Sequence, residues 1–598
     1  MASKRIMGLA TLLMVLSMLL AACGGETPTS TAVPAPAATN TTAPAAPAAT
    51  NTTAPAAPAA TDTPATGGAT TPSSDMFSWR AYAEPETFDP ALMQENLSID
   101  IGQNVYDSLV QFNPETQKIE PALAESLPDV SPDATTYTFK IRKDAKFSNG
   151  DPVTSADVKY SWNRALNNPK APYLFVMNDI KGAQEVQASA VSTDTTKPKV
   201  TEAAGIETPD AQTVKITLTG PSAYFLSQLT VWTYYVVNKN VVPMSSDNPD
   251  AWITKPGVGT GAYMLKEWKH DQSITLVRNP NYWGPKGTVD VFVPIIKDTA
   301  TAQSQFEKGT LAALDGPSPD DLARIKADPT LGKQLHSVGQ ARTVWIGLNL
   351  LHGPFSPQND EKALKLRQAI SMSIDRDQLV KLALADAGQP VTTLLPEGEP
   401  GYHAFDAYPF DPDKAKQLLA ESGHPNGQGL ENLTYTYRER DVEQRVAEQI
   451  QAQLKENLGL NIKVQGVAWK DMLQARQAHE YDMFYGSWGH DYPDPQNWLY
   501  ALFDSSQIQG VGTGTGNDPG FSDPQFDKLV RQANTLADPA KVDERMNLYH
   551  QAEEIMLKAA PMVPLYQATR YWEISPKWTG YNTNNSFVYP FRLVKPAQ

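Results

Sequence analysis

A long stretch of low-complexity sequence confines the folded core to the C-terminal part of the chain. Residues 27–75 consist almost entirely of Thr, Ala, Pro, Ser, Asn and Gly, and the segment 38–48 (ATNTTAPAAPA) is repeated letter for letter at 49–59. The stretch has no aromatic residue and almost no large aliphatic one, so it cannot bury an apolar core. Because proline favours extended polyproline II structure, we expect a spacer here and a folded part from Met76 onward.

Composition excludes several classes of protein. The chain has 598 residues, of which 41% are hydrophobic, which suffices for a sizeable core. At roughly 150 residues per domain, this length suggests about four domains. The net charge of −16 argues against nucleic-acid binding, which needs clustered Lys and Arg. The single cysteine excludes an intramolecular disulfide framework and any multi-cysteine metal site.

The N-terminus carries the pattern of an export signal. Lys4 and Arg5 precede the apolar, uncharged stretch Ile6–Leu20, which is short for a membrane span of about 20 residues but typical of a secretory signal. Leu20-Ala21-Ala22-Cys23 follows at once and resembles the bacterial lipobox. The resemblance implies a signal peptide at 1–22, cleavage before Cys23, lipidation of Cys23 and a membrane-anchored tether at 23–75. An uncleaved N-terminal anchor, or a secreted protein with a chance cysteine, remains an alternative.

Apolar spacing predicts alternating strands and helices in the folded part. Alternation at 433–437 predicts a strand, spacing of four over 442–458 with Gly459 after it predicts a helix, and 460–464 alternates again. A strand, a helix and a second strand in sequence are typical of a βαβ unit with a parallel strand pair.

Three further patterns support an α/β or mixed fold. Residues 137–141 and 214–218 alternate as strands do. Asp411 is a candidate N-cap, Pro412 suits the first helical position, and Gly423 follows the last turn of the expected helix.

A search of the sequence for catalytic motifs finds only weak candidates. The chain has no G-x-x-x-x-G-K-[ST], no H-E-x-x-H and no G-x-S-x-G. We interpret the glycine-rich run 510–520 as a mobile loop rather than a phosphate loop. His479 and His490 flank an expected strand and are a weak candidate metal pair. Asp491 and Asp494 could form a glycosidase pair only at a suitable separation in space. We therefore expect no catalytic residue, no metal and no cofactor.

Many short motifs in a fixed order resemble one family. They are NVYDSLV from Asn104, PALAES, TYTFKIRKDAKFSNGDPVTSADV, YSWNR, GTGAYMLKEW from Gly259, VRNPNYWG from Val277, LRQAISMSIDR from Leu366, YPFDPDKAKQLLAESGHPNG from Tyr408, SWGHDYPDP from Ser487 and APMVPLY ending at Tyr566. Together they resemble the extracellular solute-binding proteins of family 5, which serve ABC transporters for peptides, nickel and related solutes. APYLF, GHDYPDP and the aromatic-rich tail make the oligopeptide-binding members most similar.

The resemblance implies an α/β, periplasmic-binding-protein-like fold with two lobes (type II, cluster C) and an additional inserted domain. Ligand would bind between lobes that close on a hinge. The implied segments are lobe I at 76–117, 231–340 and 555–598, the inserted domain at 118–230, and lobe II at 341–554.

The resemblance also implies a ligand-binding carboxylate. In peptide-binding members the Asp of a G-W-x-x-D-Y motif holds the peptide's terminal ammonium, and the matching residues here are Trp488 and Asp491, with Ser487 in place of Gly. A buried carboxylate needs a fixed cationic partner, which a peptide N-terminus supplies. The alternative for Asp491 is an aspartate that only caps a loop.

Further ligand contacts are implied by the same resemblance. Trp469 matches a pocket tryptophan and Arg476 a basic residue near the cleft, although a core aromatic and a surface charge are equally good interpretations. The strand that pairs with the peptide main chain is matched by the residues Gln94, Glu95, Asn96 and Leu97. Such strand addition reads the backbone rather than the side chains.

Two departures leave the ligand open. Tyr485 stands where a peptide-binding relative carries Arg, so one contact to a peptide carboxylate is missing and the preferred peptide length is undefined. The aromatic-rich region 481–500 suits peptides but also sugars, unless its rings are core. We predict a monomeric, lipid-anchored receptor outside the cytoplasmic membrane that delivers short peptides to an ABC permease and ATPase. The alternatives are a receptor for an oligosaccharide or another small solute, and a sensory or chaperone-like lipoprotein without transport.

Overall fold

The computed structural model describes residues 75–113, 116, 118–245, 248–508, 516–581 and 590–598. The expected signal peptide, Cys23 and all but the last residue of the tether lie outside the described residues, as do residues 510–515 of the glycine-rich run. Within the described part of the chain, no helix has the length and apolarity needed to cross a membrane.

A four-stranded sheet joins the first described residues to the middle of the chain. It consists, in spatial order, of β1 (Phe77–Ser78), β10 (Val291–Pro294), β9 (Ser273–Arg278) and β8 (Tyr263–Lys269). β1 is parallel to β10, and the other pairs are antiparallel. Its core includes Phe77, whose ring centroid lies 6.2 Å from that of Phe591, so the two ends of the folded part share one apolar cluster.

A second four-stranded sheet is wholly antiparallel. Its order is β4 (Asp129–Val130), β5 (Thr136–Lys140), β7 (Thr213–Thr217) and β6 (Ile206–Asp210). The alternation seen at 137–141 and 214–218 is confirmed, because its apolar residues are buried in one cluster together with Trp162 of α3 (Ser155–Leu166). This cluster is built mainly from residues 109–236.

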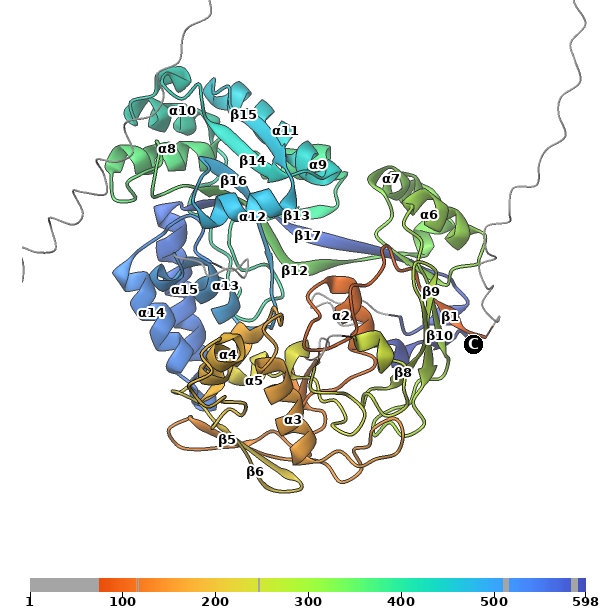
Figure 1. Cartoon of the computed structure of the whole chain (residues 1–598). Coiled ribbons are helices and arrows are strands. Elements are labelled where there is room, and N and C mark those ends of the chain that lie inside the picture. Colours follow the sequence, from red (N-terminus) through yellow and green to blue (C-terminus); the bar gives the residue numbers. More distant parts are fainter. Residues whose placement is uncertain (1–74, 114–115, 117, 246–247, 509–515, 582–589) are drawn as a thin grey trace, which may run out of the picture. The chain divides into compact units, whose positions relative to one another are not determined.

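The largest sheet has seven strands and contains the longest strands of the chain. Its path is β11 (Ala313–Asp315), β17 (Met562–Ile574), β12 (Leu335–Leu348), β16 (Met483–Gly489), β14 (Thr434–Arg438) and β15 (Lys463–Val467), with β13 (Gly388–Pro390) paired to β17. β12 and β17 are antiparallel neighbours over most of their length (Figure 1). β14 is parallel to both β15 and β16.

The predicted βαβ unit is confirmed. Strand β14 is followed by α11 (Asp441–Leu458) and then by β15, which pairs with β14 in parallel. The helix buries Val446, Ile450 and Leu454 at the predicted spacing. Gly459 ends it with φ 71°, a left-handed conformation that glycine adopts without a steric penalty.

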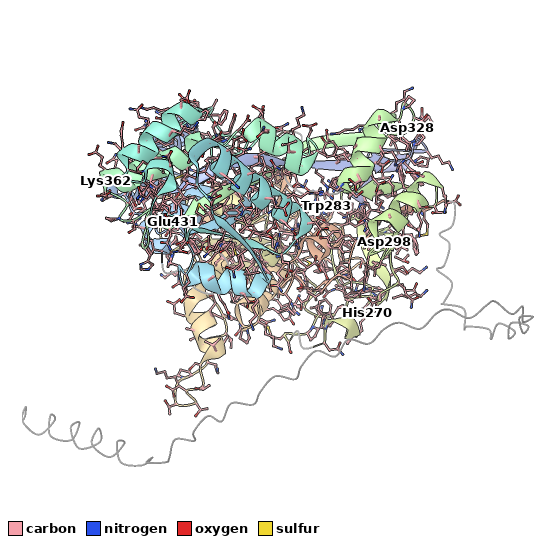
Figure 2. The ribbon with its side chains drawn as sticks, turned by 90° about the horizontal axis from the view of Figure 1, so that it is seen from above. His270, Trp283, Asp298, Asp328, Lys362 and Glu431 are labelled. Carbon is pink, nitrogen blue, oxygen red and sulfur yellow. The ribbon has the colours of Figure 1, made fainter. Side chains whose placement is uncertain are left out.

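Helix caps follow the expected chemistry. The side chain of Asp411 accepts the amide of Lys414 and Pro412 opens α10 (Pro412–Glu421), as predicted. Asp298, labelled in Figure 2, likewise accepts the amide of Thr301 at the start of α6 (Thr299–Glu307).

The remaining helices are α2 (Asn96–Gly102), α4 (Ala183–Val191), α5 (Phe225–Gln228), α7 (Pro319–Ala327), α8 (Glu361–Met372), α9 (Arg376–Leu384), α12 (Trp469–Gln477), α13 (Gln496–Phe503), α14 (Pro524–Thr535) and α15 (Val542–Ala559). Short strand pairs are formed by β2 (Val110–Asn113) with β3 (Lys118–Pro121) and by β18 (Trp578–Thr579) with β19 (Lys595–Pro596).

Two of the domain boundaries expected from the resemblance fall inside regular elements. The boundary at 340/341 lies within β12, and the boundary at 554/555 lies within α15. The apolar residues of α15 pack with those of α13 and α14 in one cluster. A boundary between lobe II and the last segment of lobe I would therefore leave this helical cluster intact if it lay within β17, whereas a boundary at 554/555 would divide the cluster.

Candidate ligand-binding site

One cavity of about 690 Å³ brings together segments that are far apart in sequence. Its lining comes from α2 and β2, from residues 173–235, from β12, β16 and α12 with the loop after β16, and from residues 590–593. Six of the nine ligand-binding residues expected from the sequence line it: Asn96, Trp469, Arg476, Tyr485, Trp488 and Asp491. The structure thus gathers most of the predicted site in one place.

The segment 94–97 is not a strand, and this part of the prediction is wrong. Glu95 is the N-cap of α2, and its carboxylate accepts the amides of Leu97 and Ser98 at 2.6 and 2.7 Å. Leu97 is fully buried, and Gln94 donates its side-chain amide to Glu86 at 3.0 Å. Because the Glu95 carboxylate accepts the backbone amides of Leu97 and Ser98, these amides are not available to pair with a ligand main chain as those of an edge strand would be. Of the four residues, only Asn96 lines the cavity.

Asp491 is held by one asparagine. The backbone amide of Asp491 donates to Oδ1 of Asn497 at 2.9 Å, and Nδ2 of Asn497 donates to Oδ2 of Asp491 at 3.2 Å. The indole Nε1 of Trp488 donates to the same Asn497 Oδ1 at 3.1 Å. This buried asparagine therefore orients both residues of the motif.

The carboxyl group of Asp491 is poised between its two protonation states. Loss of solvent raises its pKa to about 6, against a smaller opposing effect of hydrogen bonds from Asn497 and Tyr173 and of the positive charge of Arg342. No ion pair within 4.0 Å joins Asp491 to the described residues. A desolvated carboxylate of this kind is stabilised by a cationic ligand group.

The neighbours of Asp491 are fixed by contacts between buried side chains. His490 Nδ1 lies 2.6 Å from Oε2 of Glu399. Asp494 forms a bidentate pair with Arg545, with N–O distances of 2.6 and 2.9 Å. Asp494 is buried and does not line the cavity, so Asp491 and Asp494 do not face one ligand as a glycosidase pair would.

The contacts of His479 and His490, the weak candidate metal pair, do not support a metal site. His479 points both ring nitrogens at backbone carbonyls, those of Asp518 at 2.8 Å and Ile508 at 3.0 Å, while His490 contacts Glu399. Among the described residues, no three His, Cys, Asp or Glu side chains are placed to hold a metal ion.

Arg476 and Trp469 have different environments. Nε of Arg476 donates to Oδ2 of Asp518 at 2.7 Å, and its guanidinium lies 5.3 Å from the ring of Phe484. Its charge is therefore largely neutralised within the protein. Trp469 opens α12 and is 47% exposed, with the guanidinium of Arg438 at 5.0 Å from its ring, so it is a wall of the cavity rather than a core residue.

Sequence reasoning missed several residues of the lining. Arg342 of β12, Tyr173 and Asp107 belong to it. Asp107 stands in the NVYDSLV motif and Tyr173 in APYLF, but neither motif indicated a ligand contact, and Arg342 stands in no motif. Asp107 accepts a hydrogen bond from Nε1 of Trp283 at 3.1 Å, and burial raises its pKa. Trp283 is labelled in Figure 2. Only the pairing of strands and the packing of loops bring these residues to the cavity.

The sequence matches a known family over most of the folded part. Residues 118–510 match the model described as bacterial extracellular solute-binding proteins, family 5 (middle region). The chain belongs to this family, which consists of solute-binding proteins rather than enzymes. The extracellular location of the family agrees with the export signal expected at 1–22.

Individual relatives cover nearly the whole chain. The dipeptide-binding protein DppE of Bacillus subtilis is 31% identical over 81% of this chain and 85% of the relative. Heme-binding protein A of Haemophilus influenzae is 30% identical over 86% of this chain and 91% of the relative. A structure of DppA from Helicobacter pylori in complex with the peptide STSA is 27% identical, has a TM-score of 0.68, and is matched over 88% of this chain and 98% of that one. The predicted α/β, two-lobed fold of periplasmic binding proteins is confirmed.

Proposed function

We propose that this chain is the lipid-anchored receptor of an ABC importer, which captures short peptides and delivers them to a permease and ATPase in the membrane. The observation that carries the proposal is the desolvated carboxylate of Asp491 in the wall of a cavity of about 690 Å³. A peptide always brings an ammonium group that can neutralise it. The relatives whose names specify dipeptides or a bound peptide support the same ligand class.

The burial of aromatic residues favours peptides over sugars. In the region 481–500, the rings of Tyr481, Phe484, Tyr492 and Trp498 are buried in the core. Of the aromatic residues of this region, only Tyr485 and Trp488 line the cavity, where they join charged residues and aromatic residues of other segments such as Trp469. The dense aromatic run is therefore mostly packing rather than a stacking surface, although a small non-peptide solute remains the rival ligand because one relative is named for heme.

We propose that capture works by hinge closure between two lobes. Lobe I comprises 76–117, 231–340 and, in place of the expected 555–598, the C-terminal residues from within β17 onward, the inserted domain comprises 118–230, and lobe II comprises the residues between. The three apolar clusters built mainly from 77–106 with 237–313, from 109–236 and from 344–566 support this division. Lipidation at Cys23 and the tether at 23–75 would keep the receptor beside its transporter.

Binding of matched peptides tests the ligand. We expect isothermal titration calorimetry to show that N-acetylation of a tripeptide weakens binding at least about tenfold, the effect of losing a charge-assisted contact. Asp491→Asn should weaken binding of the free peptide and remove its advantage over the acetylated one. Equal affinities of the wild-type protein for both peptides would exclude the ammonium contact.

Fractionation tests the anchor separately. The full chain should partition with membranes, and Cys23→Ser should release it. If the variant stays in the membrane fraction, the apolar stretch Ile6–Leu20 is itself the anchor.

A further inference from the structure

One face of helix α2 forms part of the cavity wall. Asn96, Ile99, Asp100 and Gln103 line the cavity, and residues three and four apart lie on the same side of a helix. Asp100 stands in the middle of this face, and only 4% of its surface is exposed. The cavity therefore has a buried acidic side chain in its wall besides Asp491, and this one comes from a different segment of the chain.

The carboxylate of Asp100 is not paired within the described part of the chain. Its Oδ1 has no hydrogen-bond partner among the described residues, and no ion pair within 4.0 Å joins Asp100 to them. Its backbone carbonyl, in contrast, accepts the side-chain amides of Gln103 at 3.2 Å and Asn104 at 3.0 Å. Buried charged groups in proteins are normally paired, so an unpaired one in a cavity wall calls for a partner from the ligand.

The positive charge that acts on Asp100 comes from Arg570, which is bound to another carboxylate. Nη2 of Arg570 donates to Oδ2 of Asp315 at 3.0 Å. The same oxygen accepts hydrogen bonds from the hydroxyl of Tyr581 at 2.8 Å and from Nε1 of Trp79 at 2.6 Å. Arg570 and Asp315 balance each other in charge, so Asp100 adds a surplus negative charge beside this pair.

The ionised form of Asp100 is poorly stabilised without a ligand. Loss of solvent raises the pKa of Asp100 well above its ordinary value, and the negative charges of Asp315 and Glu95 act in the same direction. The positive charge of Arg570 opposes this rise only in part. A cationic group of a ligand would stabilise the ionised carboxylate.

Two other carboxylates of the lining have partners within the protein. Oε1 of Glu443 accepts Nε of Arg438 at 2.9 Å. Oε1 of Glu120 accepts Nδ2 of Asn113 at 2.9 Å. These groups therefore have less need of a cation from the ligand than Asp100 has.

We propose that Asp100 binds a cationic side chain of the ligand, so that the receptor favours peptides that contain lysine or arginine. The proposal rests on the proposed function, since it assumes a peptide whose terminal ammonium is at Asp491. Asp100 on α2 and Asp491 after β16 then hold two cationic groups of one peptide. The long aliphatic stems of lysine and arginine suit a carboxylate that is set into the cavity wall.

The test compares tripeptides that differ only in one side-chain charge. Derivatives of trialanine with lysine at the first, second or third position, and the matching norleucine peptides, are titrated into the mature full chain by calorimetry. Norleucine keeps the four-carbon side chain of lysine without its ammonium. The wild-type protein should bind at least one lysine peptide at least about tenfold more tightly than its norleucine counterpart, because the norleucine peptide lacks a charge-assisted contact.

Two variants assign the preference to one carboxylate. Asp100→Asn keeps the shape of the side chain but removes its charge, so lysine and norleucine peptides should bind within about twofold of each other. A cooperative thermal unfolding transition shows that this variant is folded. Asp107→Asn tests the rival carboxylate of the same lining, on which the positive charges of Arg592 and Arg142 act. An asparagine can still accept the hydrogen bond from Trp283, and the preference for lysine should persist.

Each other outcome also decides. If tripeptides bind and N-acetylation weakens them, but lysine and norleucine peptides bind alike at all three positions, the role of Asp100 is wrong while the proposed function stands. A preference that persists in folded Asp100→Asn, or is lost in Asp107→Asn alone, would overturn the assignment. If Asp100→Asn instead removes the advantage of free over acetylated peptides, the terminal ammonium lies at Asp100 and the side-chain role is wrong. If no peptide binds to the wild-type protein, the proposed function fails and the role of Asp100 fails with it.

Discussion

The imidazole Nδ1 of His490 lies 2.6 Å from Oε2 of Glu399, and neither side chain is more than 4% exposed. Burial raises the pKa of Glu399, and the neighbouring His490 opposes that effect. The pair connects the loop that carries Asp491 to the segment between β13 and α10. It therefore fixes the residue that precedes the candidate ligand-binding carboxylate.

Removing the imidazole should destabilise the protein. We expect His490→Ala to lower the free energy of unfolding by about 3–5 kcal/mol, because Glu399 would remain buried without its partner. Urea denaturation followed by tryptophan fluorescence measures the change. The control is His270→Ala, since His270 is 54% exposed and contacts Glu84 on a surface turn, where such a pair contributes less than about 1 kcal/mol. Equal losses in the two variants would contradict a structural role of the buried pair.

Peptide binding should weaken in acid through Asp491. Its pKa of about 6 in the free protein means that the carboxylate is lost as pH falls below this value. The bound ammonium would favour the ionised form, so affinity should fall about tenfold for each pH unit below 6. It should also fall above about pH 8, where the peptide's own ammonium loses its proton.

Calorimetry between about pH 4.5 and 9 measures this profile, because this range spans the pKa of Asp491 and that of the peptide's ammonium. Asp491→Asn should abolish the acid limb, and His490→Gln should retain it. An acid limb that persists in Asp491→Asn would assign the titration to another group.

Ionised Asp491 should also lower the free energy of unfolding of the ligand-free protein. Its pKa is raised above the ordinary value of 3.8, so the folded state binds the proton more tightly than the unfolded state. The stabilisation from protonated Asp491 is present below about pH 4 and is lost as pH rises through 6. At pH 7 and above, the ionised group opposes folding.

Asp491→Asn should therefore raise the free energy of unfolding at pH 7.5 by about 1–3 kcal/mol, since one pKa unit corresponds to about 1.4 kcal/mol. The gain should disappear near pH 4. Thermal or urea unfolding at both pH values measures it, and a variant that is less stable than the wild-type protein at pH 7.5 would contradict the assignment.

Residue patterns within one segment predicted the elements whose structure depends mainly on that segment. Helix α11 and its stop at Gly459 follow from apolar spacing and from the conformational freedom of glycine, and α10 follows from the cap at Asp411. The predicted strand at 460–464 shows the limit of this reasoning. Leu460 and Ile462 are buried, but β15 begins only at Lys463, because burial alone does not distinguish a strand from a packed connection.

The candidate site was predictable only where a motif marks it. Asp491 and Trp488 stand in a recognisable motif, and both line the cavity. Arg342 stands in none, and its place depends on the register that sets it opposite Gly489. The misassigned segment 94–97 shows the converse, because the local preference of Glu95 for an N-cap decides its structure.

A second buried pair should show whether the proposed inserted domain is firmly attached to lobe I. Arg164 on α3 and Asp89 in the first segment form a bidentate pair with both N–O distances at 2.7 Å, and the side chains are 2% and 0% exposed. Asp89→Ala should lower the free energy of unfolding by about 3–5 kcal/mol, because it leaves the guanidinium buried without its carboxylate. Glu207→Ala is the control, since its pair with Lys215 is exposed and contributes less than about 1 kcal/mol.

The double variant Asp89→Ala with Arg164→Met should lose less stability than the sum of the two single variants, because it removes both charges together. Urea denaturation of the four proteins gives this difference, and hydrogen exchange locates it. If the pair joins the two parts, exchange in Asp89→Ala should increase both in α3 and around β1. An increase confined to α3 would mean that the pair stabilises the helix alone, and the inserted domain would then be held to lobe I by its apolar contacts.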